Sequence, residues 1–236
     1  MIFGFKEATD TWSTHVARRV GDVITQSVKT APHHGLTDAP ICPCFTPGTM
    51  IATPRGEVRV ETLREGDQIV TRDNGLQEIR WLGQQTLSRD VLARDHTIKP
   101  ILIMAGSLGD NLPERNMVVS PQHRVLITGE PAQRHFDEAE VFVAATHLTN
   151  ATGIKPLETL RVTYLHFMFD QHQVVMSDGA WTESFQPADN TLGALGQAAH
   201  DEIMALFPAL ATPDGVASYV AARRTLTVDE AQLLQL

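Results

Sequence analysis

Cysteine is scarce in this sequence. The 236 residues contain only two, Cys42 and Cys44. Two cysteines cannot supply the several disulfides on which small secreted domains depend. A bridge between these two would close a very short loop, which the geometry of the S–S bond makes strained. The composition therefore excludes a disulfide-stapled fold.

A basic excess and long apolar runs are also lacking. The chain has 19 Lys and Arg against 28 Asp and Glu, a formal net charge of −9. Nucleic-acid binding requires a basic stripe, so we expect no nucleic-acid partner. No apolar run approaches the roughly 18 residues of a membrane span, and the first residues lack the pattern of a secretory signal. We expect a soluble protein, cytoplasmic by default, with other export routes and the oligomeric state left open.

Composition divides the chain into three regions. Residues 1–43 combine apolar residues at helical spacing with a Pro-rich stretch, which predicts an N-terminal helix and a linker. Residues 44–187 consist of short apolar runs between turn residues. Residues 188–236 return to helical spacing and are expected to form a tail packed on the middle region. Hydrophobic residues make up 42% of the chain, enough for a sizeable core.

The middle region has the pattern of a mainly β protein. Asp73-Asn74-Gly75 is typical of a hairpin turn. The expected strands are 50–53, 58–61, 68–72, 78–81, 100–104, 117–120, 124–127, 141–143, 160–169, 173–176 and 180–185. Many short strands separated by turns predict a compact all-β fold with helical appendages at both ends.

The tail carries two helix signals. Pro208 is expected to end a first helix. Five apolar residues before it fall on one helical face: Leu192, Leu195, Ala199, Ile203 and Leu206. Thr227 and Glu230 have the spacing of a capping box, which predicts a last short helix.

Two short stretches carry residues able to perform chemistry. Cys44 can attack a carbonyl group if a partner handles its proton, and histidine is the usual partner. Ser120-Pro-Gln-His123 places a hydroxyl and an imidazole together at the start of an expected strand. Each residue also has an ordinary structural interpretation, because a buried cysteine is often a small hydrophobe and Ser-Pro is often a turn.

Three motifs in order resemble those of the Hint family, the self-processing module shared by inteins and Hedgehog proteins. Cys44 with Gly48-Thr49, followed by Leu63-Arg-Glu-Gly66-Asp67, is similar to the opening block. Ser120-Pro-Gln-His123 resembles the Thr-x-x-His block, with Ser in place of Thr. Tyr164 and His172, eight residues apart and followed by an apolar strand, resemble the late block. The matches span about 44–185 and look most like the bacterial branch of the family that is not an intein.

The resemblance implies a horseshoe-like all-β fold and an autocatalytic reaction without cofactor or metal. Cys44 would attack the carbonyl of Pro43 in an N-to-S acyl shift that gives a thioester. His123 would help the amide nitrogen leave, and Ser120 would bond the scissile peptide or orient His123. Asp170 would accept the thiol proton or activate the final nucleophile, and His172 would support that second step. His166, on the same strand face as Asp170, is a weaker candidate.

The chain departs from splicing inteins at its late block. Gly179 is followed by Ala-Trp-Thr-Glu183-Ser184, without the Asn whose cyclisation completes splicing. The expected reaction is therefore cleavage or acyl transfer at Pro43–Cys44 and no full splicing. The substrate is the chain's own N-terminal segment, the acceptor is water or a small nucleophile, and each molecule reacts once.

Two alternatives stay open at this point. The domain could keep the Hint fold as a scaffold without chemistry. Alternatively, Cys42 and Cys44 could join His33-His34 in a zinc-binding module, although Cys-x-Cys is not the usual zinc spacing.

Overall fold

The computed structural model describes residues 42–149 and 151–234. The expected N-terminal helix and most of the linker, in residues 1–41, lie outside these ranges. Among the residues described, no helix has the length and apolar character that crossing a bilayer requires.

Thirteen strands dominate the described ranges: β1 Met50–Thr53, β2 Gly56–Arg59, β3 Gln68–Thr71, β4 Gly75–Glu78, β5 Trp81–Ser88, β6 Ile101–Ile103, β7 Met117–Val119, β8 Arg124–Thr128, β9 Glu140–Ala144, β10 Ile154–Pro156, β11 Arg161–Met168, β12 Val174–Ser177 and β13 Ala180–Glu183. The α-helices are α2 Arg89–Arg94, α3 Glu130–Phe136, α4 Asp189–Ala194, α5 Gln197–Leu206, α6 Pro213–Ser218 and α7 Val228–Ala231. Single 3-10 turns lie at Val60–Thr62, His96–Ile98, Ala145–Leu148, Pro208–Ala211 and Gln232–Leu234.

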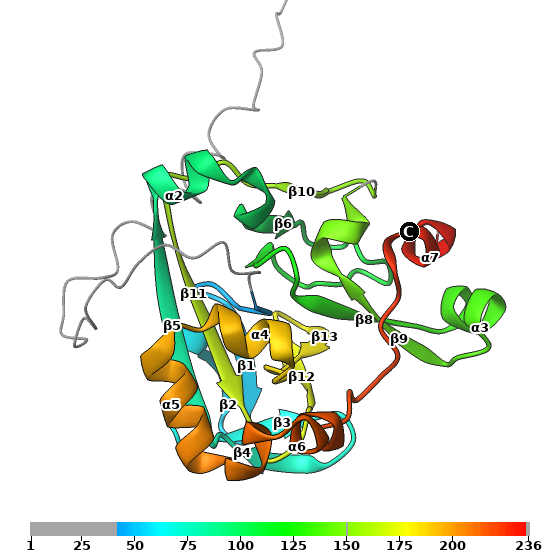
Figure 1. Cartoon of the computed structure of the whole chain (residues 1–236). Coiled ribbons are helices and arrows are strands. Elements are labelled where there is room, and N and C mark those ends of the chain that lie inside the picture. The colour runs from blue at the N-terminus through cyan, green and yellow to red at the C-terminus, as the bar shows by residue number, and fades with distance from the viewer. Residues whose placement is uncertain (1–41, 150, 235–236) are drawn as a thin grey trace, which may run out of the picture. The chain divides into compact units, whose positions relative to one another are not determined.

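The strands form three antiparallel sheets. The largest has the order β2-β1-β12-β13-β8-β9, with β3 pairing both β12 and β4. A second sheet has the order β10-β6-β7, and the third is the long pair β5–β11. Figure 1 shows this pair as the two longest neighbouring arrows of the molecule. The prediction of a mainly β fold is confirmed, and helices follow the last strand as expected for the C-terminal appendage.

The hairpin prediction is confirmed, and the strand after it needs a correction. β3 and β4 pair with Thr71 opposite Gly75, so Asp73 and Asn74 lie in the turn. The strand expected over 78–81 is instead the junction of β4 and β5, and β5 continues to Ser88. Its middle residues are polar and exposed and do not alternate with apolar ones, so period-2 reasoning could not detect them.

Strand β11 separates two parts of the core because its side chains alternate. Val162, Tyr164 and Met168 pack with Trp81 and the two cysteines. Leu165, Phe167 and Phe169 pack on the other side with Phe45. His166 has the parity of Tyr164 and Met168, and therefore lies on the side of the cysteines.

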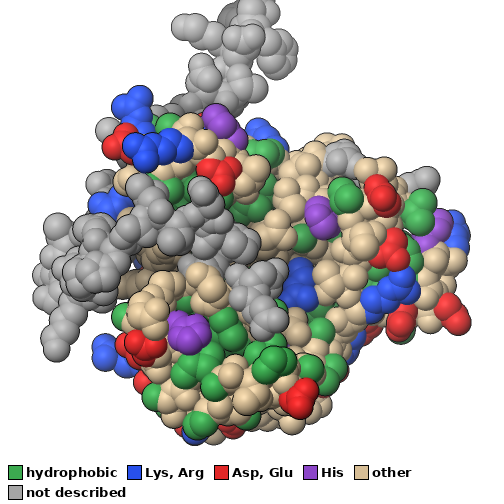
Figure 2. Space-filling view, viewed as in Figure 1, with side chains coloured by type: hydrophobic (Ala, Val, Ile, Leu, Met, Phe, Trp, Pro, Cys, Tyr) green, Lys and Arg blue, Asp and Glu red, His purple; other side chains and the backbone are tan. Residues whose placement is uncertain are grey.

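The single helix expected before Pro208 is two helices in the structure. Gly196, with a φ of +75°, separates α4 from α5. The break turns Leu206 outward, where it is 47% exposed, whereas Leu192 and Ile203 are buried beside Trp81. Figure 1 shows α5 along the lower part of β5, and the Trp81 indole donates to Glu202 on α5 at 3.1 Å. Figure 2 shows apolar side chains gathered over the region of α5 and α6.

The last helix begins as the sequence predicts. The Thr227 hydroxyl accepts from the Glu230 backbone N–H, and the Glu230 carboxylate accepts from that of Thr227. This reciprocal pair is a capping box, and it confirms that motif.

Gly83 lies opposite His166 in the β5–β11 pair, and a substitution there tests how tightly the neighbouring rings pack. A Cβ there would lie 2.5 Å from the Trp81 ring and 2.6 Å from His166 Nε2. We expect Gly83→Ala to lower the free energy of unfolding by about 1–3 kcal/mol, because both rings must move. Gly193→Ala, in helix α4 with open space around it, should be neutral or raise that energy by about 0.5–1 kcal/mol. Urea denaturation measures both, and equal stability of the two variants would contradict the packing described.

Candidate functional site

Cys44 lies in a short extended segment held between two strands. The Phe45 N–H donates to the Leu165 carbonyl at 2.7 Å, and the Leu165 N–H donates back at 2.9 Å. On the other side, the Ser120 N–H donates to the Cys44 carbonyl at 3.0 Å. Because β11 and the end of β7 hold this segment from both sides, the peptide before Cys44 has a fixed place in the core. Cys42, Pro43 and Cys44 are all buried.

The Ser120 hydroxyl bridges the backbone on both sides of Pro43. It accepts a hydrogen bond from the Cys44 N–H at 2.8 Å and donates one to the Cys42 carbonyl at 2.9 Å. The structure therefore places this side chain in contact with the amide nitrogen of the Pro43–Cys44 bond.

His123 follows Ser120 in a tight turn, closed by its N–H donating to the Ser120 carbonyl at 3.1 Å. Its ring is buried and contacts the Phe45 ring edge-on, with 4.4 Å between centroids. Neither ring nitrogen has a hydrogen-bond partner within the described chain. Burial lowers the pKa of His123 to about 4, so its imidazole is neutral at pH 7. Buried polar groups are normally paired, and His123 is an exception to this rule. Both of its ring nitrogens are therefore free to bond a reacting group.

His166 completes a cluster with the two cysteines, which we call the thiol–imidazole cluster. Its Nδ1 lies 3.4 Å from Cys44 Sγ and 3.6 Å from Cys42 Sγ, and the two sulfurs are 3.2 Å apart. The His166 ring stacks on Trp81 at 5.1 Å and lies 5.6 Å from the Phe185 ring. These aromatic neighbours hold Nδ1 toward the sulfurs.

The two thiols differ in acidity. Burial, together with the neighbouring Cys42 sulfur, raises the pKa of the Cys44 thiol well above its ordinary value. The hydrogen bond from Cys44 lowers the pKa of Cys42, and His166 lowers it further. Cys44 therefore keeps its proton at rest and must lose it before it can attack. At rest its thiol donates a hydrogen bond to the Cys42 carbonyl at 3.0 Å. The nearby groups able to take the proton away are Cys42 Sγ and His166 Nδ1.

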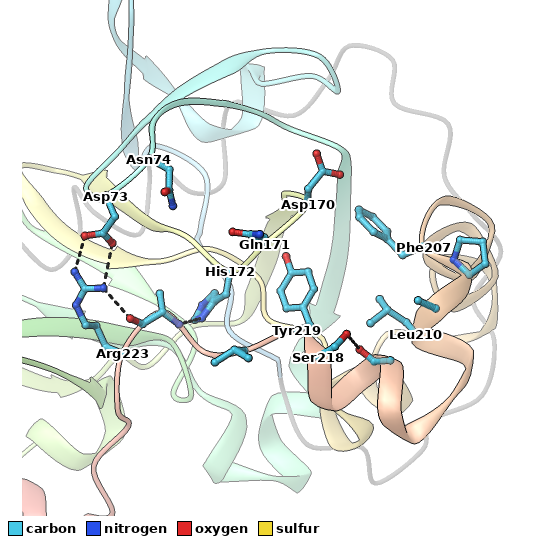
Figure 3. A pocket seen from close by; sticks show the side chains of 15 residues that line it. Asp73, Asn74, Asp170, Gln171, His172, Phe207, Leu210, Ser218, Tyr219 and Arg223 are labelled. Carbon is cyan, nitrogen blue, oxygen red and sulfur yellow. Dashed lines mark hydrogen bonds and ion pairs between the residues drawn. The ribbon is translucent and has the colours of Figure 1, made fainter.

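His172 bonds elsewhere in the fold. Its Nδ1 accepts from the Ala222 N–H at 3.0 Å, and its Nε2 lies 3.2 Å from the Ser184 carbonyl and 3.3 Å from the Glu183 carboxylate. A cavity of about 590 Å³ lies between the β3–β4 turn and the C-terminal tail, and Figure 3 shows the His172 ring beside it. His172 thus connects the tail to strand β13.

Asp170 also lines this cavity rather than joining the cysteines. Strand β11 ends at Met168, so the alternation that would place Asp170 beside His166 stops before it. Its carboxylate is exposed and pairs with Arg80 at 3.4 Å. The roles expected for Asp170 and His172 stay predictions.

Glu183 forms a buried charged network that the sequence did not reveal. The Arg124 side chain and backbone N–H both donate to its carboxylate, at 2.7 and 2.8 Å. Burial raises the pKa of Glu183, but the Arg124 charge and the His172 hydrogen bond outweigh burial and lower this pKa to about 2. Its negative charge in turn raises the pKa values of His123 and Cys44.

Comparison with known proteins now decides the family. Residues 43–189, more than half of the chain, match the family model described as "Hint domain". The chain belongs to the Hint domain family. Solved structures with similarity to this Hint domain include the gp41-1 intein, with 12% identity over 59% of this chain and 97% of that one and a TM-score of 0.37. A bacterial intein-like domain from Clostridium thermocellum has 15% identity over 60% and 97%, with a TM-score of 0.38.

A third similar structure is a DnaB intein from Synechocystis sp. PCC 6803. It has 10% identity over 60% of this chain and 98% of that one, with a TM-score of 0.39. The chain matches no curated protein sequence.

Sequence reasoning pointed to Cys44, Ser120 and His123 of this Hint domain and gave His166 as a weaker candidate, and the structure places His166 against both sulfurs. Strand parity was the available signal, because it places His166 on the face of Tyr164 and Met168. Cys42 was noticed as half of a zinc motif with His33-His34, and those histidines lie outside the described residues. Glu183 gave no distinct signal, because a charge at a strand end is usually exposed.

The buried neutral His123 predicts a loss of stability in acid. Its folded-state pKa of about 4 lies below the unfolded value of about 6.5, so the unfolded chain binds more protons between these limits. The free energy of unfolding should fall by about 3 kcal/mol through His123 alone between pH 7 and pH 4. The His123→Phe variant cannot take up this proton, so its free energy of unfolding should fall correspondingly less between pH 7 and pH 4. Urea denaturation across this pH range tests it, and parallel curves for the two proteins would contradict the assignment.

Proposed function

We propose that this Hint domain cleaves its own chain between Pro43 and Cys44 through a thioester. The Hint fold supports self-processing in general. The observation that carries the specific proposal is the contact of the Ser120 hydroxyl with the amide nitrogen of that bond, at 2.8 Å. The proposed nucleophile, Cys44 Sγ, has a proton acceptor, His166 Nδ1, at 3.4 Å.

The first step is an N-to-S acyl shift. Cys44 transfers its thiol proton to His166 Nδ1, and the thiolate attacks the Pro43 carbonyl carbon. The C–N bond of the Pro43–Cys44 peptide then breaks, and the nitrogen takes up a proton. One C–S bond replaces one C–N bond, so the step is an isomerisation of the chain that needs no cofactor.

Proton delivery to the departing nitrogen is the role of His123. An amine is a poor leaving group unless it is protonated as it departs. The neutral imidazole gives the proton on one ring nitrogen to the amine and takes up a replacement at the other nitrogen, so it ends neutral. His166 releases the thiol proton, which balances this uptake, and no partner within the described chain occupies either nitrogen of His123. Ser120 holds the amide nitrogen in place before the reaction.

The second step resolves the thioester. Water or another small nucleophile attacks the Pro43 carbonyl, the Cys44 thiol leaves, and residues 1–43 are released. The residues directly after Gly179, Ala180 to Ser184, lack the Asn that splicing requires, which supports cleavage as the outcome. Asp170 and His172 remain candidates for assisting this step. Each chain reacts once, so the activity is single-turnover.

Separate substitution of the two cysteines tests this function. We expect the wild-type chain, incubated with a thiol, to yield a fragment that begins at Cys44. Cys44→Ala should stay intact because it lacks the nucleophile. Cys42→Ala should still cleave, since His166 can accept the proton. Intact mass spectrometry distinguishes these outcomes, and fragmentation of Cys44→Ala at this bond would contradict the mechanism.

The choice of proton acceptor gives a further prediction. His166→Gln should slow thiol-induced cleavage by about 100-fold or more, the usual contribution of a positioned base. Asp170→Asn should leave this first step near the wild-type rate, because its carboxylate pairs with Arg80 at the surface. Rates come from the decay of the intact mass. The reverse ranking of the two variants would assign the proton to Asp170.

A further inference from the structure

The thiol–imidazole cluster has a composition that the cleavage reaction does not require. Cleavage uses one sulfur, yet Cys42 Sγ, Cys44 Sγ and His166 Nδ1 all lie within 4.8 Å of one another. Their residues are only 3%, 1% and 3% exposed. Two sulfurs and one imidazole nitrogen around one point are the ligands preferred by soft metal ions.

The spacing of the three atoms suits one central ion. Metal–sulfur bonds of about 2.3 Å and metal–nitrogen bonds of about 2.0 Å place bound S and N atoms about 3.5 Å apart. The observed S–N distances are 3.4 and 3.6 Å. The sulfurs, now 3.2 Å apart, need to separate by about half an ångström to admit the ion.

The surrounding residues hold the imidazole in the orientation that a ligand needs. His166 Nε2 faces Gly83, where a Cβ would lie only 2.6 Å away, and the ring stacks on Trp81. Nδ1 is therefore directed at both sulfurs without a change of rotamer. A preset ligand geometry lowers the entropic cost of binding.

We propose that Cys42, Cys44 and His166 bind a thiophilic d10 cation, Cu(I) or Zn(II), and that the bound ion prevents cleavage. Binding releases the proton from each thiol that still carries one, and the thiolates and neutral Nδ1 donate electron pairs to the ion. Three donors are enough for Cu(I), whereas Zn(II) takes a fourth. Binding stands on the geometry alone, and the block of cleavage rests on the proposed function.

The block follows from which atoms the ion occupies. It engages the lone pair with which Cys44 would attack Pro43, and it covers the nitrogen that would accept the thiol proton. Cleavage between Pro43 and Cys44 would also separate the two sulfur ligands onto different fragments. The site therefore belongs to the uncut chain and is destroyed by the reaction it controls.

Metal titration of the full uncut chain tests the site directly. The chain is purified with a chelator and without added thiol, its intact mass is checked to confirm that it is uncut, and the chelator is removed before titration with Zn(II) against a chromogenic indicator. A second arm uses tetrakis(acetonitrile)copper(I) without oxygen, against bicinchoninate. We expect one ion per chain in at least one arm, which also identifies the ion. Co(II) should give a sulfur-to-metal absorption band in the near ultraviolet if both thiolates bind.

Matched variants separate the site from the cleavage reaction. Cys42→Ser should lower the metal affinity by more than the roughly 10- to 100-fold that is typical of substitutions next to metal ligands. This variant should still cleave, and added metal should no longer slow its cleavage. His166→Gln should lose affinity as well, and circular dichroism checks that both variants fold. Unchanged binding by both folded variants, or no binding by wild-type protein in either arm, would overturn the site.

Cleavage is measured on the same samples. Wild-type cleavage that starts only after a chelator is added supports the block, and equal rates with and without bound metal overturn it. A chain that binds metal but never cleaves, even without metal, contradicts the proposed function and leaves the metal site supported.

Discussion

The Ser120 hydroxyl joins the backbone on either side of Pro43, accepting from the Cys44 N–H and donating to the Cys42 carbonyl. Both bonds are buried, where an unpaired backbone group costs about 1–3 kcal/mol. They fix the peptide before Cys44 in one arrangement relative to the turn that carries His123. Cys44, the Pro43–Cys44 peptide bond and the turn of His123 therefore depend on one side chain for their relative positions.

Strand β11 provides the second constraint on the site. One face packs on Phe45, which anchors the Cys44 segment by two backbone hydrogen bonds to Leu165. The other face presents His166 to both sulfurs. A single strand thus positions Cys44 through its backbone and presents His166 through a side chain. The tail helices close this side of the core by packing on Trp81, which stacks on His166.

The sequence was informative where local patterns determine the outcome. Alternating apolar runs and Asp73-Asn74-Gly75 predicted most strands and the hairpin, and three motifs pointed to Cys44, Ser120 and His123. It was less informative where the position of a side chain depends on where a strand ends. Asp170 has the parity of His166, but the strand stops at Met168 and leaves its carboxylate exposed beside Arg80. Glu183 is likewise buried only because Arg124 and His172 converge on it from other elements.

The thioester at Pro43 is the central claim, and hydroxylamine tests it most directly because it attacks thioesters far faster than amides. The wild-type chain is incubated with neutral hydroxylamine and its intact mass is followed, beside Cys44→Ala. A fragment ending in a Pro43 hydroxamate, together with one beginning at Cys44, is the predicted result, and it should be absent from the variant. A wild-type chain that stays intact, or that is cut at another bond, would contradict the account.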